Sequence, residues 1–310
     1  MNFCDIIGNE DIKKYLLSSI KDDKSFQSYL FCGTDGIGKK IIAKEFAKKI
    51  LCMNKENTND DCNCKSCKCF EGLNHPDFFV INENGETIKI DQIRDITSKV
   101  IEQPIISNKK VYIINDCEKM TVEAQNCLLK TLEEPPEFAI IILITSNENV
   151  ILNTIKSRCM TIKFKNIPDD ELKKYAEEKL GYTQMTENIL KSFNGSIGKA
   201  ILQKENQEKY IIIENIIDNL RKKNIIDLMN EAKVIYDKEN INMILEYIII
   251  CLYQKRNENN GYVSCIEKVN NCIERLKHNC NFDMTIDTML LEMWECVGGI
   301  FDETYSRNKF

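Results

Sequence analysis

The segment Gly33-Thr34-Asp35-Gly36-Ile37-Gly38-Lys39-Lys40 follows the apolar run Tyr29–Cys32 and leads into a stretch whose apolar residues recur at helical spacing. A strand, a glycine-rich turn and a helix in this order form the setting of a phosphate-binding loop. Glycines let backbone amides point inward, and the N-terminus of the following helix favours an anion. We therefore expect an α/β domain of the nucleotide-binding type around this segment.

Two positions depart from the pattern of an active ATPase. Lys40 stands where the motif G-x-x-x-x-G-K-[ST] has a hydroxyl that ligates magnesium, and an ammonium group cannot ligate a cation. Asn115 and Asp116 end the apolar run Val111–Ile114, where such enzymes carry two acids that hold magnesium and polarise water. Since only Asp116 is a carboxylate, we expect a retained fold without hydrolysis; phosphate binding alone stays an open alternative.

Short β-branched runs alternate with amphipathic stretches through the first half of the chain, which predicts parallel β-α-β units. The expected strands are Tyr29–Cys32, Phe78–Asn82, Val111–Asn115, Phe138–Thr145 and Thr161–Phe164. The expected helices are Lys39–Cys52, Ile90–Ile101, Thr121–Glu134 and Ile151–Ser157. Pro135-Pro136 ends the third helix because proline has no amide hydrogen and clashes with the preceding turn.

After Pro168 the apolar residues recur at helical spacing, and no further strand is predicted. Gly195 and Gly198 punctuate a short helical unit, and the chain from residue 207 onward predicts several packed helices. The sequence thus predicts an α/β domain over residues 1–165, a small helical domain over 166–206 and a helical domain over 207–310.

The composition and charge of the chain favour a globular protein and disfavour a stand-alone nucleic-acid binder or a membrane protein. The 310 residues are 43% hydrophobic and 29% charged, which is typical of a soluble globular chain. Residues 166–310 carry 19 basic and 24 acidic side chains and the first half is nearly neutral, so neither half has the basic stripe of a stand-alone nucleic-acid binder. No apolar run is long enough to span a membrane and the start lacks the order of a signal peptide. We therefore expect a cytoplasmic protein with reduced cysteines and no membrane partner.

The run Ala124-Gln125-Asn126-Cys127-Leu128-Leu129-Lys130-Thr131-Leu132-Glu133-Glu134-Pro135-Pro136 resembles the helix and turn of bacterial clamp-loader subunits, which are AAA+ proteins. Only Cys127, in place of alanine, departs from that family's pattern. Ser157-Arg158-Cys159 resembles the family's S-R-C motif, and Ser146 falls at the sensor position of its ATPases. The resemblance implies that Arg158 reaches the ATP bound on a neighbouring subunit, a role suited to a planar, permanently charged guanidinium. Outside this context, a surface ion pair would be the ordinary interpretation of Arg158.

The lid motif separates classes within this family. Motor subunits (tau/gamma) carry G-S-x-R, whose arginine senses nucleotide in cis, whereas this chain has Gly195-Ser196-Ile197-Gly198. Lys40, Asn115 and Gly198 therefore depart from the motor pattern, while Arg158 is retained. This combination resembles the delta-prime class of DNA polymerase III subunits, which lends an arginine to a neighbour and need not hydrolyse ATP itself.

Five cysteines lie close together in the chain: Cys52, Cys62, Cys64, Cys67 and Cys69. Tetrahedral zinc takes four soft ligands, often supplied as close pairs such as Cys64-x-x-Cys67. Clamp-loader relatives carry a zinc module of the form C-x8-C-x2-C-x2-C at this point, so the resemblance implies a zinc-binding insertion over residues 52–69. Its implied ligands are Cys52, Cys62, Cys64 and Cys67, with Cys69 as a substitute. Asp61 stands where the second cysteine of the family falls, and four protein ligands would make the zinc structural.

The resemblance implies a AAA+ phosphate-loop module with a parallel sheet, an all-α lid and an all-α collar that joins subunits into a heteropentamer. The implied partners are the motor subunits (tau/gamma), the delta subunit and, through the complex, the sliding clamp and primed DNA. The candidate residues for nucleotide, bound without hydrolysis, are Gly33, Thr34, Asp35, Gly36, Gly38, Lys39, Lys40, Asp116 and Ser146. Arg158 is the candidate for the role in trans.

Two other functions stay open. An active clamp-loader ATPase of the tau/gamma type would use Lys39 and Asp116 despite their altered neighbours. A DNA-binding module centred on the cysteine-rich loop would bind primed DNA with steeply salt-dependent affinity, although the acidic balance argues against it. His75 and His278 lie in no recognisable nucleophile motif, which disfavours a hydrolase of the triad type.

Overall fold

The computed structural model describes residue 3 and residues 6–21, 25–54, 62–82, 85–278 and 280–298. The chain forms two compact units. Unit 1 is Met1–Glu171 together with Gly195–Gly198, and unit 2 is Leu172–Asn194 together with Lys199–Phe310. The finer division into three domains over 1–165, 166–206 and 207–310 stays a prediction.

Unit 1 contains one parallel sheet with the strand order β2-β3-β4-β1-β5. Its strands are β1 (Ser28–Cys32), β2 (Phe78–Ile81), β3 (Lys110–Ile114), β4 (Ala139–Thr145) and β5 (Met160–Lys163). Every residue of β1, β3 and β4 is buried, as expected for parallel strands whose two faces are both covered by helices. The expected α/β class with a parallel sheet is confirmed, and each expected strand is present.

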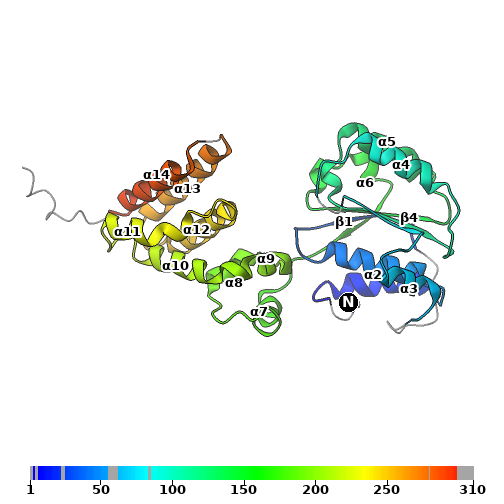
Figure 1. Ribbon diagram of the computed structural model, residues 1–310, viewed down its shortest axis with the longest axis horizontal. Helices are drawn as coiled ribbons and strands as arrows, with labels where there is room; N and C mark the ends of the chain where they lie inside the picture. The colour runs from blue at the N-terminus through cyan, green and yellow to red at the C-terminus, as the bar shows by residue number, and fades with distance from the viewer. Residues whose placement is uncertain are drawn as a thin grey trace, which may run out of the picture. The chain divides into compact units, whose positions relative to one another are not determined.

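Helices lie on both faces of this sheet (Figure 1). One layer consists of α1 (Glu10–Lys21), α2 (Lys39–Leu51) and α3 (Lys65–Glu71). The other consists of α4 (Ile90–Val100), α5 (Val122–Glu133) and α6 (Asn153–Lys156). Alternate residues of a strand point to opposite faces, so Tyr29 and Phe31 join the core under α2 while Leu30 joins the core under α5.

The expected helix over Ile151–Ser157 is shorter in the structure. α6 covers only Asn153–Lys156, and Glu148–Val150 forms a separate 3₁₀ turn. Leu152 precedes the helix with non-helical backbone angles (φ −58°, ψ 139°), and its backbone amide donates to the buried side-chain oxygen of Gln125 on α5 (2.9 Å). A tertiary hydrogen bond therefore satisfies an amide that the start of the helix leaves without an internal partner.

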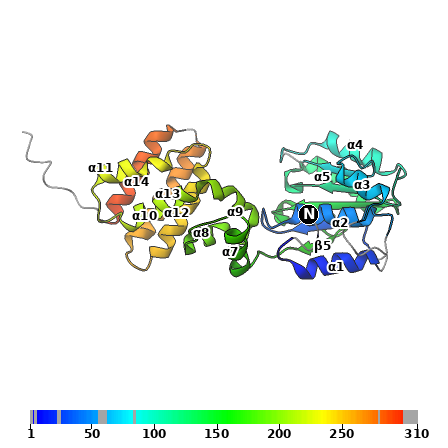
Figure 2. The same ribbon diagram turned by 60° about the horizontal axis from the view of Figure 1, so that its bottom comes forward.

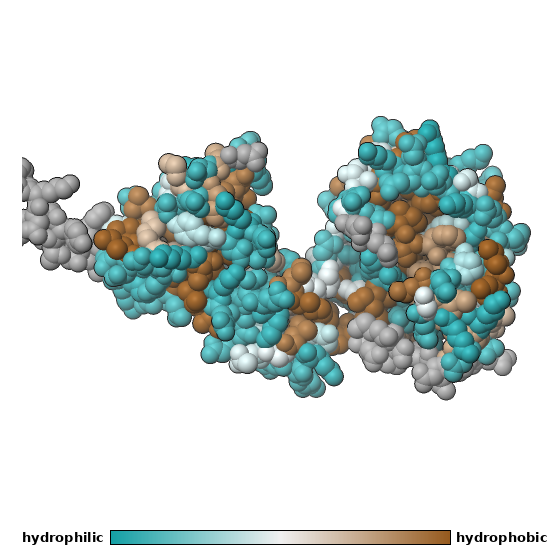
Figure 3. Space-filling model, in the orientation of Figure 1, coloured by the Kyte–Doolittle hydropathy of each residue, from teal (hydrophilic) through white to brown (hydrophobic). Residues whose placement is uncertain are grey.

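The edge of the sheet at β2 is partly exposed. Figure 3 shows hydrophobic residues between the two helical layers on the face of unit 1 that is turned to the viewer. The side chains of β2, together with Ile96 and Tyr112, line a cavity of about 470 Å³ at this edge. The rings of Phe79 and Tyr112 stack there, with centroids 4.9 Å apart.

The second unit is built of helices alone in its described part (Figure 2). After α7 (Asp169–Glu178), its helices are α8 (Glu187–Phe193), α9 (Ile197–Gln203), α10 (Gln207–Asp218), α11 (Ile225–Glu231), α12 (Ile241–Lys255), α13 (Gly261–Lys277) and α14 (Phe282–Cys296). Trp294 is fully buried on α14, and its indole nitrogen donates to the carbonyl oxygen of Lys223 (2.8 Å). Among the described helices of both units, we find none long and apolar enough to cross a membrane.

Candidate functional site

The carboxyl ends of β1, β3 and β4 meet at one edge of the sheet, as parallel pairing requires. The glycine-rich loop follows β1, Asn115 and Asp116 follow β3, and Ser146 follows β4. The fold therefore brings together residues that the sequence placed in three separate motifs.

The glycine-rich loop turns through left-handed backbone angles at Gly36 (φ 74°) and Gly38 (φ 94°), which favour glycine. Gly38 precedes the first turn of α2, so the start of that helix faces the loop. Lys39 is 5% exposed, and its ammonium group donates to the carbonyl oxygens of Gly33 (2.5 Å) and Thr34 (2.7 Å). Burial lowers the pKa of Lys39, and the nearby carboxylate of Asp35 opposes this shift.

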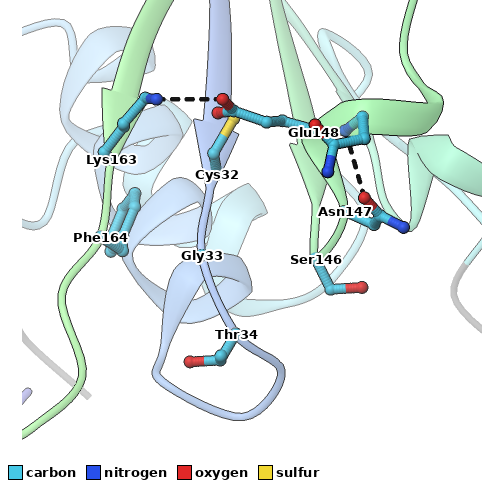
Figure 4. A pocket seen from close by; sticks show the side chains of 9 residues that line it. Cys32, Gly33, Thr34, Ser146, Asn147, Glu148, Lys163 and Phe164 are labelled. Carbon is cyan, nitrogen blue, oxygen red and sulfur yellow. Dashed lines mark hydrogen bonds and ion pairs between the residues drawn. The ribbon is translucent and has the colours of Figure 1, made fainter.

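A cavity of about 290 Å³ opens beside this loop, where β1, β4 and β5 end (Figure 4). Thr34 and Ser146, both from the expected nucleotide set, contribute to its lining. Lys163 and Glu148 form an ion pair of 3.0 Å across its upper part in the view of Figure 4. The cavity is polar, and its wall carries both signs of charge.

The structure explains the loss of an acid at position 115. The Asn115 amide donates to the carbonyl oxygen of Asn82 (3.4 Å), and the Asn82 amide donates to the carbonyl oxygen of Asn115 (3.3 Å). Asn115 thus joins the ends of β3 and β2. Asp116 adopts a left-handed backbone angle (φ 47°), and its carboxylate pairs with Lys119 (3.3 Å).

Glu118 is a site residue that the sequence analysis missed. Its carboxylate accepts hydrogen bonds from the hydroxyl (2.5 Å) and the backbone amide (3.2 Å) of Ser146, the residue at the sensor position. Burial by itself would raise the pKa of Glu118, but these hydrogen bonds lower it. In the sequence, Glu118 is visible only as an acid two residues after Asp116. None of the motifs named above includes this position, so the sequence did not mark it as a site residue.

The lid segment Gly195–Gly198 contacts the glycine-rich loop directly. The Gly198 amide donates to the carbonyl oxygen of Gly36 (2.9 Å). A Cβ atom at Gly198 would lie 2.7 Å from the Cα atom of Gly36, and a Cβ atom at Gly36 would lie 2.3 Å from the Ser196 hydroxyl. Only glycine fits at position 198 in this arrangement, so the absence of the motor class's arginine there has a steric reason.

We predict that Gly198→Ala destabilises unit 1 by about 1–3 kcal/mol, because the added methyl group forces the lid segment away from the backbone of Gly36. Urea unfolding measures this loss. Ile201→Ala is the control, since Ile201 is half-exposed on the same helix and its truncation should change stability by less than about 0.5 kcal/mol. Equal stability of Gly198→Ala and the wild type would contradict the close contact.

Arg158 lies just after α6, one residue beyond its C-cap. Its side chain is 33% exposed. The guanidinium donates to the carbonyl oxygen of Thr154 (2.9 Å) and to the hydroxyl of Ser157 (3.2 Å), and it pairs with the carboxylate of Glu133 (2.6 Å). The arginine is therefore held by defined partners while part of it faces solvent.

Four cysteines gather into one cluster: Cys52, Cys62, Cys64 and Cys67. Their Sγ atoms all lie within 4.8 Å of one another, and those of Cys52 and Cys62 are 3.6 Å apart. A tetrahedral zinc with Zn–S bonds of about 2.3 Å would set the sulfur atoms roughly 3.8 Å apart. The cluster could hold a metal ion, and the donor set fits zinc.

The irregular spacing of Cys62 and Cys64 does not prevent the cluster. Cys64 has extended backbone angles (φ −65°, ψ 164°) just before α3, and alternate residues of an extended chain face the same side. Cys69 lies outside the cluster, so its expected role as a substitute finds no support in this arrangement. Asp61 lies outside the described residues.

The electrostatics of the cluster favour one thiolate. Burial alone would raise the pKa of Cys64, but backbone hydrogen bonds from Cys67 and Met53 lower it to about 6. Burial raises the pKa of Cys52 and of Cys67. A bound metal ion would favour the thiolate form of all four ligands, so binding would release protons.

A buried hydrogen-bond network centred on His75 involves residues next to this cluster in the chain. The hydroxyls of Ser66 and Ser107 both donate to the carbonyl oxygen of Leu51 (2.7 and 2.8 Å). His75 Nε2 lies 2.9 Å from the Ser66 hydroxyl oxygen, and His75 Nδ1 accepts from the backbone amide of Asp77 (3.0 Å). Since the Ser66 proton already goes to Leu51, Nε2 must donate, and the imidazole is neutral.

This network joins segments that carry cysteines of the cluster. Leu51 directly precedes Cys52, and Ser66 directly precedes Cys67. The Asp77 carboxylate accepts from the backbone amides of Ile105, Ile106 and Ser107 at 2.6–2.9 Å. The network therefore attaches the cysteine-rich insertion to the sheet at the start of β2.

We predict that His75→Gln removes a pH dependence of stability. Burial lowers the pKa of His75 in the folded protein, so the unfolded chain takes up the proton first as the pH falls below about 6.5. The stability of the wild type should therefore fall, relative to that of His75→Gln, between pH 7.5 and the lower folded pKa. Urea unfolding at several pH values measures the difference, and parallel pH profiles would contradict the neutral imidazole.

The sequence model of the family described as DNA polymerase III, delta subunit, matches residues 8–168, which is more than half of the chain. The chain belongs to this family. It is thus a member of the clamp-loader AAA+ proteins, and the match covers the sheet with the glycine-rich loop, Arg158 and the cysteine cluster.

Curated relatives include both classes of subunit. The delta' subunit of Bacillus subtilis (strain 168) is 38% identical over 154 residues, which are 49% of this chain and 46% of the relative. The tau subunit of the same organism is 40% identical over 169 residues (53% and 29%), and the tau/gamma subunit of Haemophilus influenzae is 33% identical over 187 residues (60% and 26%). The chain therefore spans between about a quarter and half of the length of these relatives.

A solved structure supports the fold over most of the chain. A gamma subunit-related protein of DNA polymerase III from Thermotoga maritima is 19% identical, with a TM-score of 0.52 over 91% of this chain and 99% of that protein. At this identity the likeness shows the fold alone.

Proposed function

We propose that this chain is a delta-prime type of clamp-loader subunit, a brace that lends Arg158 to the ATP site of an adjacent motor subunit. The observation that carries this proposal is the contrast between the two sites. Arg158 is retained and partly exposed, whereas the chain's own nucleotide site departs from the motor pattern at Lys40 in the phosphate loop, at Asn115 after β3 and at Gly198 in the lid segment. Such a chain would act on a neighbour's ATP and not on its own.

The residues of the chain's own nucleotide site support the binding of ATP better than its hydrolysis. Lys39 and the glycine-rich loop keep the elements of a phosphate cradle. Asn115 is engaged with Asn82, and the Ser146 hydroxyl is engaged with Glu118. ATPases of this type hold magnesium with two acids, and of these two positions only Asp116 is an acid in this chain. ATP bound without hydrolysis is therefore the state that the residues favour.

The assembly in which this brace would work is a heteropentamer with the motor subunits (tau/gamma) and the delta subunit. Through it, the chain would help to open the sliding clamp and place it on primed DNA in the cytoplasm. The domain over residues 207–310 would be the collar that joins subunits, because its helices carry exposed apolar side chains such as Tyr253, Val263 and Met284. The lid would cover residues 166–206.

Arg158 would act by electrostatics. A guanidinium is charged at every physiological pH, and its planar edge matches phosphate oxygens. Placed against the triphosphate of the adjacent subunit, it would stabilise the negative charge that develops as the γ-phosphoryl group is transferred to water. The structure offers this group on the short connection between α6 and β5.

We further propose that zinc occupies the cysteine cluster in a structural role. Four thiolate ligands leave no position open for a substrate, so the metal would fix the insertion and carry out no chemistry. Its free energy of binding would add to the folding of the segments that carry the four cysteines, whose Cys52, Cys62 and Cys67 are buried together.

For the role in trans, we predict that Arg158→Ala lowers ATP turnover of the reconstituted loader by at least about 10-fold, because the transition-state charge loses a cation. Assembly should be unchanged, since Arg158 is a partly exposed residue. Steady-state ATPase assays with clamp and primed DNA measure turnover, and gel filtration checks assembly.

Two outcomes of this experiment would count against the proposal. Unchanged turnover with Arg158→Ala would refute the role in trans. ATP hydrolysis by the purified chain at the rate of a motor subunit, lost in Lys39→Ala, would favour an active ATPase of the tau/gamma type.

For the metal, we predict that Cys64→Ser/Cys67→Ser lowers both zinc content and melting temperature, because two of the four ligands are lost. Cys69→Ser is the matched control: Cys69 lies on the same helix as Cys67 and outside the cluster. Metal analysis and thermal unfolding provide the readouts. Full zinc content in the double variant would reject this ligand set.

A further inference from the structure

We propose that Glu133 is the positioning residue that orients Arg158 toward the neighbouring subunit; this inference rests on the function proposed above. The Glu133 carboxylate lies 2.6 Å from one terminal nitrogen of the Arg158 guanidinium. The other terminal nitrogen donates to the carbonyl oxygen of Thr154 and to the hydroxyl of Ser157. The guanidinium is thus fixed from two sides.

Glu133 is held in place by the end of a rigid helix. It is the last residue of α5, and Glu134 leaves the helix with φ −131° and ψ 63° before Pro135-Pro136. Leu128 and Leu132 of α5 are buried in the core, and Thr121 caps the first turn of the helix. The carboxylate therefore stands on an element that cannot shift without disturbing the core.

α5 also fixes the segment that carries Arg158. The buried side chain of Gln125 accepts from the backbone amide of Leu152 (2.9 Å) and donates to the carbonyl oxygen of Val150 (3.3 Å). The same helix thus anchors the approach to α6 through Gln125, and it anchors Arg158, two residues after the end of α6, through Glu133. The distance between the two anchors sets where the guanidinium lies.

The pair contributes orientation more than stability. The side chains of Arg158 and Glu133 are 33% and 48% exposed, and ion pairs with such exposure add little to folding. An arginine side chain has many rotamers, and an unrestrained one would have to be ordered each time it meets a phosphate. Guanidinium has five N–H donors, so the contacts with Glu133, Thr154 and Ser157 leave donors for an anion.

The chain provides a matched control for this carboxylate. Glu134, the next residue, is exposed and forms no ion pair within the described part of the chain. Glu133→Gln and Glu134→Gln each remove one negative charge at the same end of α5. A general effect of charge near the subunit interface would appear in both variants, whereas an orienting contact would appear only in Glu133→Gln.

The test uses the full chain reconstituted with motor and delta subunits, clamp and primed DNA. Glu133→Gln should lower kcat for ATP about three- to tenfold with KM unchanged, because binding of ATP on the motor subunit does not depend on the orientation of Arg158. Glu134→Gln should match the wild type. In the Arg158→Ala background, Glu133→Gln should cause no further loss, since the residue acts only through the arginine.

A second readout separates this inference from the function on which it rests. In the chain alone, NMR relaxation of the Arg158 side-chain Nε–H group should show more motion in Glu133→Gln than in the wild type. Glu134→Gln should show the same motion as the wild type. Unchanged motion, a rise in turnover, or an additive loss in the Arg158→Ala background would each overturn the positioning role. If Arg158→Ala itself leaves turnover unchanged while the NMR result holds, the role in trans fails, and the pair is only structural.

Discussion

The parallel pairing of β1 with β4 and β5 is the constraint on which the candidate nucleotide site depends. Cys32 pairs with Thr145 in the register of β1 and β4, and the Gly33 amide continues that ladder to the carbonyl oxygen of Thr145 (3.3 Å). The glycine-rich loop and Ser146 therefore leave the sheet side by side. A shift of one residue would turn every side chain of β1 to the opposite face, so the two buried cores hold this register.

Helix α5 has a comparable role for the arginine. Its sequence resembles the clamp-loader pattern, and the structure gives that pattern a physical meaning. Gln125 holds the approach to α6, buried leucines hold α5 against the sheet, and Glu133 pairs with Arg158. The two prolines end the helix at the point where this carboxylate is needed. One amphipathic helix thus supplies both packing and orientation.

Much of the fold could be predicted because its signals are local. Apolar runs predicted the five strands, and the strand, glycine turn and helix around residues 28–51 predicted the loop. The cysteine cluster was also accessible, since the four expected ligands lie close together in the chain and do converge. α1 and α3 were missed: α1 carries Ile12, Leu16, Leu17 and Ile20 at helical spacing, a local signal that the sequence analysis did not use, and α3 is a helix of only seven residues.

By itself the sequence determined which chemical groups are available: a phosphate loop without its magnesium hydroxyl, a retained arginine and four clustered thiols. Only the tertiary structure decided their partners. Asn115 binds Asn82, Glu118 binds Ser146, and Gly198 contacts Gly36, each across 28 or more residues of chain. Periodicity and spacing report what lies within a few residues, whereas such contacts exist only after the sheet and its two helical layers have formed.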